Sequence, residues 1–335
     1  MGTGRQKQQR ITIKDIAAAA DVDPSTVTRA LQGSERVKAE TRQRISALAS
    51  QMGYVPNMAA RTLVTQRSQL LGLVVPDMTN PFFAALARGV EEEAASQQLQ
   101  VLIRNTDGNE VAEREAIQFF LELKVDGLLI PMARCPDAYY ATLSDDIPLV
   151  HVNRIDARHH VSCDMAHGTR AVVKHLIDLG HRRIGFVTGP SSPAQQPKRN
   201  GYEAALQEAG IGVDKDLLLH FDGSLACVEE LADAVIRIAP TAVFAWNDVC
   251  AMGLIRALRD RGIGIPTDLS IAGHDDIALA ACYDPPLTTV HWPMYELGQQ
   301  AVRYLFQLHA AGSGFVPAIP APTLVVRGST AAVTR

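Results

Sequence analysis

Apolar and polar positions follow two different patterns along the chain, and the change comes near residue 69. Before it, apolar residues recur three or four positions apart in short segments, which is the spacing of one helix face. After it, short apolar runs alternate with longer amphipathic stretches, which predicts parallel sheets with helices on both faces. The chain is therefore expected to consist of a small helical head and an α/β body.

Within the body, eight apolar runs are predicted as strands and the stretches between them as helices. The strands are expected at Leu70–Val75, Gln100–Ile103, Gly127–Pro131, Leu149–Asn153, Arg183–Thr188, Ala242–Trp246, Ser270–Gly273 and Thr288–His291. The helices are expected to include Phe83–Gln97, Val111–Leu123, Thr169–Leu179 and Val249–Arg261. Roughly 260 residues are many for one such sheet, so two doubly wound halves are expected.

The head begins with a segment, Ile11–Leu31, that predicts two short helices with well-marked starts. Thr12 is placed to cap the first helix, with Asp15 three residues later, and Asp23 to cap the second, with Pro24 in its first turn. Two short helices joined by a tight turn form a helix-turn-helix, whose second helix enters the DNA major groove. A third helix, from residue 38 or 39 to 52, is expected to close the small core.

The predicted second helix leaves Ser25 and Arg29 on its outward face, because Val27, Ala30 and Leu31 face inward. Arg29 then becomes a candidate for a bidentate hydrogen bond to a guanine edge. The alternative is that Arg29 pairs only with phosphate or with a local acid.

Charge separates the same two parts. Residues 1–67 contain 11 Lys and Arg against 5 Asp and Glu, a charge of +6, whereas the remainder contains 21 against 31, a charge of -10. A basic head on an acidic body indicates that the head meets a polyanion. The plainer alternative is a solvated basic tail.

Other function classes find little support in the sequence. No apolar stretch is long enough for a transmembrane helix and no signal peptide is evident, so a cytoplasmic protein without a membrane partner is expected. The five cysteines are scattered and never form C-x-x-C pairs, which favours reduced thiols over disulfides or zinc. No phosphate loop, nucleophile motif or metal cluster indicates an enzyme, and no cofactor or metal is expected.

Polar residues gather where the predicted strands of the body end. Asp77 follows the first strand, Asn153 ends the fourth, and Trp246-Asn247-Asp248 and Gly273-His274-Asp275-Asp276 follow later ones. Ligands of such sheets bind beyond the carboxyl ends of strands, and Asp, Asn and aromatic faces suit a polyol. For any single member the alternative is a helix cap.

The head and the segment after it resemble the lactose/galactose repressor (LacI/GalR) family. The resemblance lies in Ile11-Thr12-Ile13-Lys14-Asp15-Ile16-Ala17, Val22-Asp23-Pro24-Ser25-Thr26-Val27-Thr28-Arg29-Ala30-Leu31 and Gly53-Tyr54-Val55-Pro56-Asn57-Met58-Ala59-Ala60-Arg61-Thr62-Leu63. It implies that residues 57–63, by themselves a short linker, form a hinge helix that pairs with its copy in the DNA minor groove. Leu63 would wedge between base pairs beside Ala60 and kink the DNA. The DNA-binding residues are thus expected to be Thr12, Pro24, Ser25, Thr26, Arg29, Asn57, Ala60 and Leu63.

The body resembles the same family over almost its whole length, through phrases such as Val75-Pro76-Asp77-Met78-Thr79-Asn80-Pro81-Phe82-Phe83 and Pro285-Pro286-Leu287-Thr288-Thr289-Val290. The resemblance implies a periplasmic-binding-protein-like core of two doubly wound parallel-sheet subdomains joined by three crossovers. The expected domains are the helix-turn-helix head at 11–56, the hinge and linker at 57–68 and the core at 69–330. Subdomain one would take about 69–165 and 294–321, and subdomain two about 166–293 and 322–330.

The resemblance also implies an effector site in the cleft of the core. Together with the strand-end pattern, it gives as expected effector-binding residues Asp77, Phe82, Phe83, Asn153, Lys198, Arg199, Trp246, Asn247, Asp275 and Met294. The family usually has an arginine where Lys198 stands, so either Lys198 or the adjacent Arg199 takes its role. Asn153 stands where relatives often have aspartate, so the ligand is not to be copied from a relative. Arg134, Arg154, Lys198 and Arg199 leave an anionic sugar open, against the alternative of solvated surface cations.

These observations predict a homodimeric, ligand-responsive transcription repressor of carbohydrate-metabolism genes. Its expected partners are a near-palindromic double-stranded DNA operator and a small effector: a sugar, sugar acid or sugar phosphate, with a purine less favoured. A sugar-transport module would leave the capped helix pair unexplained. An enzyme with two Rossmann-like halves would need catalytic groups that the sequence does not show.

Overall fold

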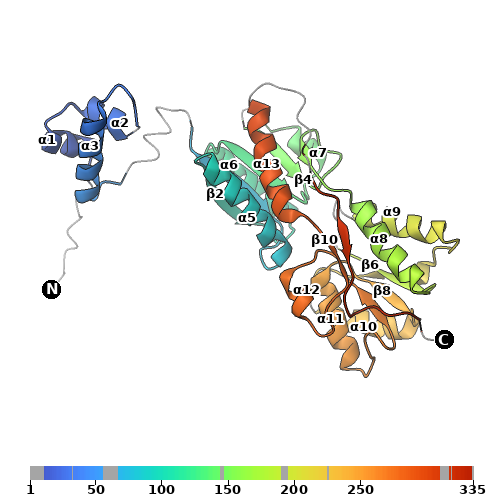
Figure 1. Ribbon diagram of the computed structural model, residues 1–335. Coiled ribbons are helices and arrows are strands. Elements are labelled where there is room, and N and C mark those ends of the chain that lie inside the picture. Colours follow the sequence, from blue (N-terminus) through green and yellow to red (C-terminus); the bar gives the residue numbers. More distant parts are fainter. Residues whose placement is uncertain are drawn as a thin grey trace, which may run out of the picture. The chain divides into compact units, whose positions relative to one another are not determined.

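The computed structural model describes residues 11–31, 33–55, 67–143, 147–189, 195–224, 226–309, 317 and 319–333. The chain divides after Ser68 into two compact units, a head and a core. The head contains α1 (Ile13–Ala20), α2 (Pro24–Leu31) and α3 (Ala39–Gln51), drawn in blue in Figure 1. The three helices predicted for the head are thus confirmed.

Short helices need defined ends, and the head supplies them. The backbone N–H of Thr12 donates to Asp15 Oδ2 at 2.8 Å while the N–H of Asp15 donates to Thr12 Oγ1 at 3.4 Å, which forms the predicted capping box. At the start of α2, the N–H of Ser25 donates to Asp23 Oδ1 at 2.7 Å. The helices then bury a small common core centred on Ile16, Val27 and Ile45.

The first half of the core is built on a five-stranded parallel sheet in the order β2-β1-β3-β4-β5. Its elements are β1 (Leu70–Val75), α5 (Pro81–Ser96), β2 (Gln100–Asn105), α6 (Glu110–Glu122), β3 (Gly127–Pro131), α7 (Asp137–Tyr140), β4 (Leu149–Val152) and β5 (His160–Val161).

Alternate residues of β1 face opposite layers. Leu71 and Leu73 pack in the cluster that holds residues of α5 and α13 (Met294–His309), whereas Val74 packs in the cluster of α6. Because every residue of β1 after Leu70 is buried, the strand reads as a continuous apolar run, as expected of a sheet covered on both faces.

The second half is built on a four-stranded parallel sheet in the order β7-β6-β8-β9. Its elements are α8 (Met165–Asp178), β6 (Ile184–Thr188), α9 (Gln195–Glu208), the 3-10 turn η1 (Lys215–Leu217), β7 (Leu218–His220), α10 (Cys227–Ile238), β8 (Ala242–Phe244), α11 (Asp248–Arg259), β9 (Ser270–Ala272) and α12 (Ala278–Cys282). The two doubly wound halves expected from the sequence are thus present.

Late segments of the chain join the halves. β10 (Thr289–His291) pairs antiparallel with β11 (Thr323–Val325) and continues the second sheet through single bridges from Ala272 to Thr288 and from Asp275 to His291. After β10 the chain returns to the first half, where α13 lies against α5 (Figure 1). Two glycines allow this close approach: a Cβ on Gly89 would lie 2.0 Å from Tyr295 O, and one on Gly298 would lie 2.4 Å from Leu86 O.

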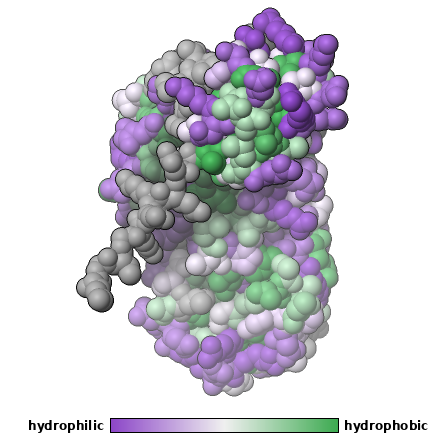
Figure 2. All heavy atoms as spheres, turned by 90° about the vertical axis from the view of Figure 1, so that its left-hand side faces the viewer, coloured by the Kyte–Doolittle hydropathy of each residue, from purple (hydrophilic) through white to green (hydrophobic). Residues whose placement is uncertain are grey.

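The outer surface mixes polar and apolar side chains. Hydrophilic side chains line the edges of the face in Figure 2, and apolar ones gather in patches between them. Val111, Ile155 and Leu279 are large apolar side chains with more than half of their surface exposed. Among the described residues, no helix combines the length and the apolar character needed to cross a membrane.

Candidate functional site

The outward face of α2 carries the two residues predicted to read DNA. Ser25 and Arg29 are exposed and lie one helical turn apart, whereas Val27 and Ala30 are buried beneath them. Among the described residues Arg29 has no ion-pair partner within 4 Å. Hydrogen bonds from Ser25 and the charge of Arg29 nevertheless lower the pKa of Asp23, so Arg29 interacts with a local acid without forming a close pair. Pro24 and Thr12 are also exposed, and Thr26 is half-buried.

Three predicted DNA-binding residues, Asn57, Ala60 and Leu63, lie outside the residues that the structure describes. Their roles at the hinge stay predictions.

A cavity of about 550 Å³ lies between the carboxyl ends of the two sheets of the core. This is where ligands of parallel α/β sheets bind. Residues of both halves form its wall: Pro76, Asp77, Asn80, Phe82, Phe83, Asp107, Gly108, Met132, Arg134, Met165, Lys198, Phe221, Asp222, Gly223, Ser224, Trp246, Asn247, His274, Asp275 and Trp292.

Seven of the ten predicted effector residues line this cavity: Asp77, Phe82, Phe83, Lys198, Trp246, Asn247 and Asp275. The other three lie outside the lining. Asn153 Nδ2 donates to Met294 Sδ at 3.9 Å, and both side chains are buried. Arg199 is turned away to Glu203, with Nε 2.6 Å from Oε1.

Lys198 projects into the cavity from α9. Its Nζ donates to the carbonyl oxygen of Trp246 at 2.8 Å and lies 4.0 Å from the centre of the indole ring. Burial lowers the pKa of Lys198 to about 8, although the nearby carboxyls of Asp275 and Asp248 raise it. The indole ring lies directly against Gly189, the residue after β6. A Cβ on this residue would lie 2.1 Å from the ring, so the missing side chain permits the contact.

Asp275 occupies an unusual backbone conformation at the cavity wall. Its φ is 126° and that of Asp276 is 55°, values that cost energy for residues with a Cβ and that cluster at functional sites. Burial raises the pKa of Asp275 well above its usual value; the charge of Lys198 opposes this shift and that of Asp248 adds to it.

A hydrogen-bonded chain fixes the orientation of Asp275. Trp292 Nε1 donates to His274 Nε2 at 2.9 Å, so the ring hydrogen of the neutral imidazole lies on Nδ1. His274 Nδ1 is 3.2 Å from Asp275 Oδ1 and donates to it. Burial and the charge of Lys198 lower the pKa of His274, which keeps the ring neutral in this role.

Several polar residues at the strand ends also cap helices, as the alternative interpretation required. Asn247 Oδ1 accepts the N–H of Cys250 at 2.8 Å, and Asn80 Oδ1 accepts that of Phe82 at 3.0 Å. Both residues still line the cavity. Capping therefore positions these side chains there and does not exclude contact with a ligand.

Asp248 is a structural member of the predicted group and does not line the cavity. Its carboxylate accepts hydrogen bonds from Thr289 Oγ1 at 2.5 Å and from the N–H of Ile277 at 2.9 Å. Burial raises the pKa of Asp248 to about 6, while these hydrogen bonds lower it. Asp248 thus ties α11 to the loop that carries Asp275.

Sequence reasoning missed part of the wall. Asp107 and Gly108 follow β2, Phe221 to Ser224 follow β7, and Trp292 follows β10. The strand-end pattern could have found Asp107 and Trp292, because their strands were predicted; β7 was not predicted. Across the described residues, no group of His, Cys, Asp and Glu is arranged to hold a metal ion.

Comparison with known proteins finds relatives for both parts of the chain. Residues 12–57 match the family of bacterial regulatory proteins of the lacI family, and residues 173–330 match a periplasmic binding protein-like domain. The HTH-type transcriptional regulator DegA of Bacillus subtilis is 36% identical over 303 residues, covering 88% of this chain and 90% of DegA. The ribose operon repressor of Haemophilus influenzae is 34% identical over 331 residues, covering 95% and 98%.

A solved structure of the lac repressor dimer, bound to operator and the anti-inducer ONPF, matches with a TM-score of 0.86 and 25% identity. It covers 97% of this chain and 100% of the other. The exposed helix α2, the cavity between two parallel sheets and these relatives lead to one conclusion. The chain belongs to the LacI family and is a ligand-responsive, DNA-binding transcription regulator, not an enzyme.

Proposed function

We propose that this regulator represses genes of carbohydrate metabolism and that a small polyhydroxylated effector binds in the cavity of the core. The observation that carries the proposal is the chemistry of the cavity wall. Aromatic faces of Phe82 and Trp246 suit the C–H surface of a sugar, and Asn247 and Asp275 offer polar groups for its hydroxyls. The related ribose operon repressor supports this class of effector.

Lys198, and not Arg199, takes the place of the family's usual arginine in this proposal. Lys198 lines the cavity and is 4% exposed, whereas Arg199 pairs with Glu203 outside the lining. A lysine offers three donors from one point, so it holds a ligand oxygen with less directional constraint than an arginine. Asn153 and Met294 contact each other behind the cavity lining and are assigned no direct contact with the effector in this proposal.

DNA recognition is assigned to the head. Ser25 and Arg29 would reach base edges in the major groove, and the residues of the predicted hinge would enter the minor groove. A homodimer would present two heads, so its operator would be a near-palindrome. The protein would act in the cytoplasm, where the DNA lies. The domains proposed for this mechanism are the head at 11–56, the hinge at 57–68 and the core at 69–330.

The effector would act through the two halves of the core. Residues from both halves line the cavity. Late in the chain, α13 packs against α5 of the first half, and β11 pairs with β10. A ligand that contacts both walls favours one arrangement of the halves, and this preference is the coupling free energy that operator binding would respond to.

The test begins with a thermal-shift screen of sugars, sugar acids, sugar phosphates and purines on the full chain, because a ligand of the folded state raises its melting temperature. With the effector identified, Asp275→Ala is expected to weaken effector binding roughly 30-fold or more, the contribution of one or two buried hydrogen bonds. Operator binding without effector should survive.

The control is Asp260→Ala, which removes an exposed aspartate on the surface of the core that lies outside the cavity lining. This variant should keep the full response. If Asp275→Ala also responds fully, the effector binds elsewhere and the proposed site is wrong.

A further inference from the structure

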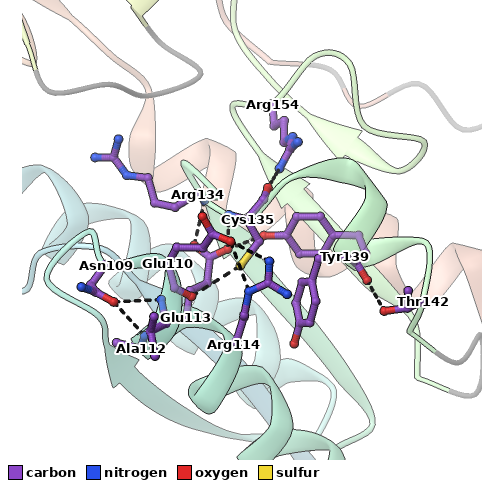
Figure 3. Close-up of polar contacts among 12 residues, drawn as sticks. Asn109, Glu110, Ala112, Glu113, Arg114, Arg134, Cys135, Tyr139, Thr142 and Arg154 are labelled. Carbon is purple, nitrogen blue, oxygen red and sulfur yellow. Dashed lines mark hydrogen bonds and ion pairs between the residues drawn. The ribbon is translucent and has the colours of Figure 1, made fainter.

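Arg134 is the least satisfied charged side chain at the cavity wall. It follows β3, lines the cavity and is half-buried. Its Nε is buried without a hydrogen-bond partner, and no carboxylate among the described residues lies within 4 Å of the guanidinium. In Figure 3 the side chain points away from the polar network beside it. A partly desolvated cation that has no ion pair is stabilised when another molecule supplies an anion in direct contact with it.

The neighbouring Arg154 shows what a structural arginine looks like in this fold. Its Nε, like that of Arg134, is buried without a hydrogen-bond partner, but it lies 3.5 Å from Asp156 Oδ1. Its two other nitrogens are satisfied: Nη1 donates to the carbonyl oxygen of Cys135 at 2.8 Å, and Nη2 pairs with Asp137. Arg154 therefore differs from Arg134 in having ion-pair partners. It does not line the cavity. Arg154, which follows β4, therefore stabilises the loop after β3, whereas Arg134, which belongs to that loop, lines the cavity.

The three solvent-facing acids of the cavity are already engaged within their own loops. Asp77 Oδ1 accepts from the N–H and the hydroxyl of Thr79, at 2.8 and 2.6 Å. Asp107 Oδ1 accepts from Asn105 Nδ2 at 2.5 Å, and Asp222 Oδ1 from the N–H of Ser224 at 2.7 Å. These carboxylates hold turns, and none of them forms an ion pair with Arg134.

Glu113 holds Arg134 in this position through its backbone. The buried carboxylate of Glu113 accepts the N–H of Arg134 at 2.8 Å and that of Cys135 at 2.9 Å (Figure 3). It also accepts the hydroxyl of Tyr140. Burial and the charge of Glu113 raise the pKa of Tyr140, so the phenol stays a donor. Burial lowers the pKa of Arg134 and the charge of Glu113 raises it, but no oxygen of Glu113 lies within 4 Å of a guanidinium nitrogen, so the two form no ion pair.

Space for the guanidinium comes from Gly108. A Cβ on this residue, whose φ is +63°, would lie 3.4 Å from Arg134 Nη2. That distance is an ordinary van der Waals contact, so it is the backbone conformation that favours glycine here, and the absent side chain leaves this side of the guanidinium open.

We infer that Arg134 binds a carboxylate or phosphate group of the effector, so that the effector is an anionic polyol such as a sugar acid or sugar phosphate. A planar guanidinium suits the paired oxygens of either group. The inference rests on the proposed function, since it places the anion in the same cavity. The hydroxyl-bearing part of the effector would then extend towards Trp246 and Asp275 on the opposite wall.

The test uses the two tryptophans of the chain, Trp246 and Trp292, which both line the cavity and report binding by their fluorescence. The probes are D-ribose, D-ribonate and D-ribose 5-phosphate, the corresponding glucose, gluconate and glucose 6-phosphate, and inorganic phosphate. Each is titrated into the full-length wild type, Arg134→Gln and Arg114→Gln. Arg114 pairs with Glu110 outside the cavity and is the matched control.

For at least one sugar, the wild type and Arg114→Gln should bind an anionic form roughly tenfold or more tightly than the neutral one, as a charge-assisted hydrogen bond predicts. Arg134→Gln should lose this preference while its melting temperature without ligand does not fall. Preference for the acid or for the phosphate distinguishes the two anions.

Two results would overturn the inference in different ways. If the neutral sugars bind as tightly as the anions, or if Arg134→Gln keeps the preference, Arg134 does not bind an anionic group of the effector. The proposed function would not be contradicted by that result. If no probe changes the fluorescence or the melting temperature of any variant, the polyol cavity itself falls with it.

Discussion

The head and the core place their proposed functional side chains in opposite environments. In the head, Ser25 and Arg29 are exposed on α2 and have only to match DNA. In the core, Lys198, His274 and Asp275 are almost completely buried and hold one another through hydrogen bonds and charge. One helix is enough to position side chains that contact DNA at the surface, whereas the side chains of the cavity are positioned by many elements of the core. Substitutions should therefore act locally and additively in the head and cooperatively in the core.

The largest effect is expected from the head. Arg29→Ala should cost about 1–3 kcal/mol of operator-binding free energy and relax the preference at one base pair, because a base-reading contact is lost. Binding to a set of single-base operator variants measures this. Arg36→Ala, which removes an exposed arginine outside α2, should weaken all sequences alike if it acts at all. Uniform weakening by Arg29→Ala as well would reduce Arg29 to a phosphate contact.

A smaller effect is expected from the charge in the core. Because the pKa of Lys198 is about 8, it loses its proton as the pH rises through that value, and the affinity for an effector that accepts its hydrogen bonds should fall. The fall is at most about tenfold per pH unit for one proton. Lys198→Arg stays charged and should give a flat profile between pH 7 and 9, measured by effector titration.

In the same pH range, operator binding without effector should stay constant, which separates the core from the head. Equal pH profiles for wild type and Lys198→Arg would show that another group sets the dependence.

The smallest effect concerns the stability of the head alone. Thr12→Ala removes the capping box of α1 and should lower the free energy of unfolding of the head by about 1 kcal/mol. Differential scanning calorimetry of the full chain should show the head transition shifted and the core transition unchanged. Thr28→Ala is the matched control, since Thr28 donates only to the carbonyl of Pro24 within α2. An equal shift in both variants would argue against the cap.

The sequence predicted the head well because local signals decide it. Caps at Thr12 and Asp23 and the helical spacing of apolar residues are all contained in Ile11–Leu31. In the core, the long apolar runs gave β1 and β3 with their bounds, but β5, β7 and β11 were missed. β5 has only two residues. β7 and β11 have three residues, as β8, β9 and β10 do, but they are less buried than those three and so less like the buried strands that an apolar run predicts.

The burial of Lys198, on which the proposed preference over Arg199 rests, could have been predicted from the sequence. Lys198, Gly201, Tyr202 and Ala205 are the buried positions of one face of α9, at spacings of three, four and seven residues from Lys198. Gly201 is needed there because a Cβ would lie 2.4 Å from Ala166 O. The helix was not predicted, so this periodicity went unused. Arg134, in contrast, depends on Glu113 in α6 and on Gly108 after β2, which are distant in sequence and could not be foreseen.

The glycine contacts between α5 and α13 have a mechanical consequence. Both helices begin beside the cavity, α5 with Phe82 and Phe83 in its wall and α13 two residues after Trp292. At Gly89 and Gly298 the two backbones touch without side chains between them, so neither helix slides or tilts without moving the other. A ligand that displaces the first turn of either helix would therefore move both helices together. Each helix has 16 residues and is about 24 Å long, so the displacement would reach across the first half of the core.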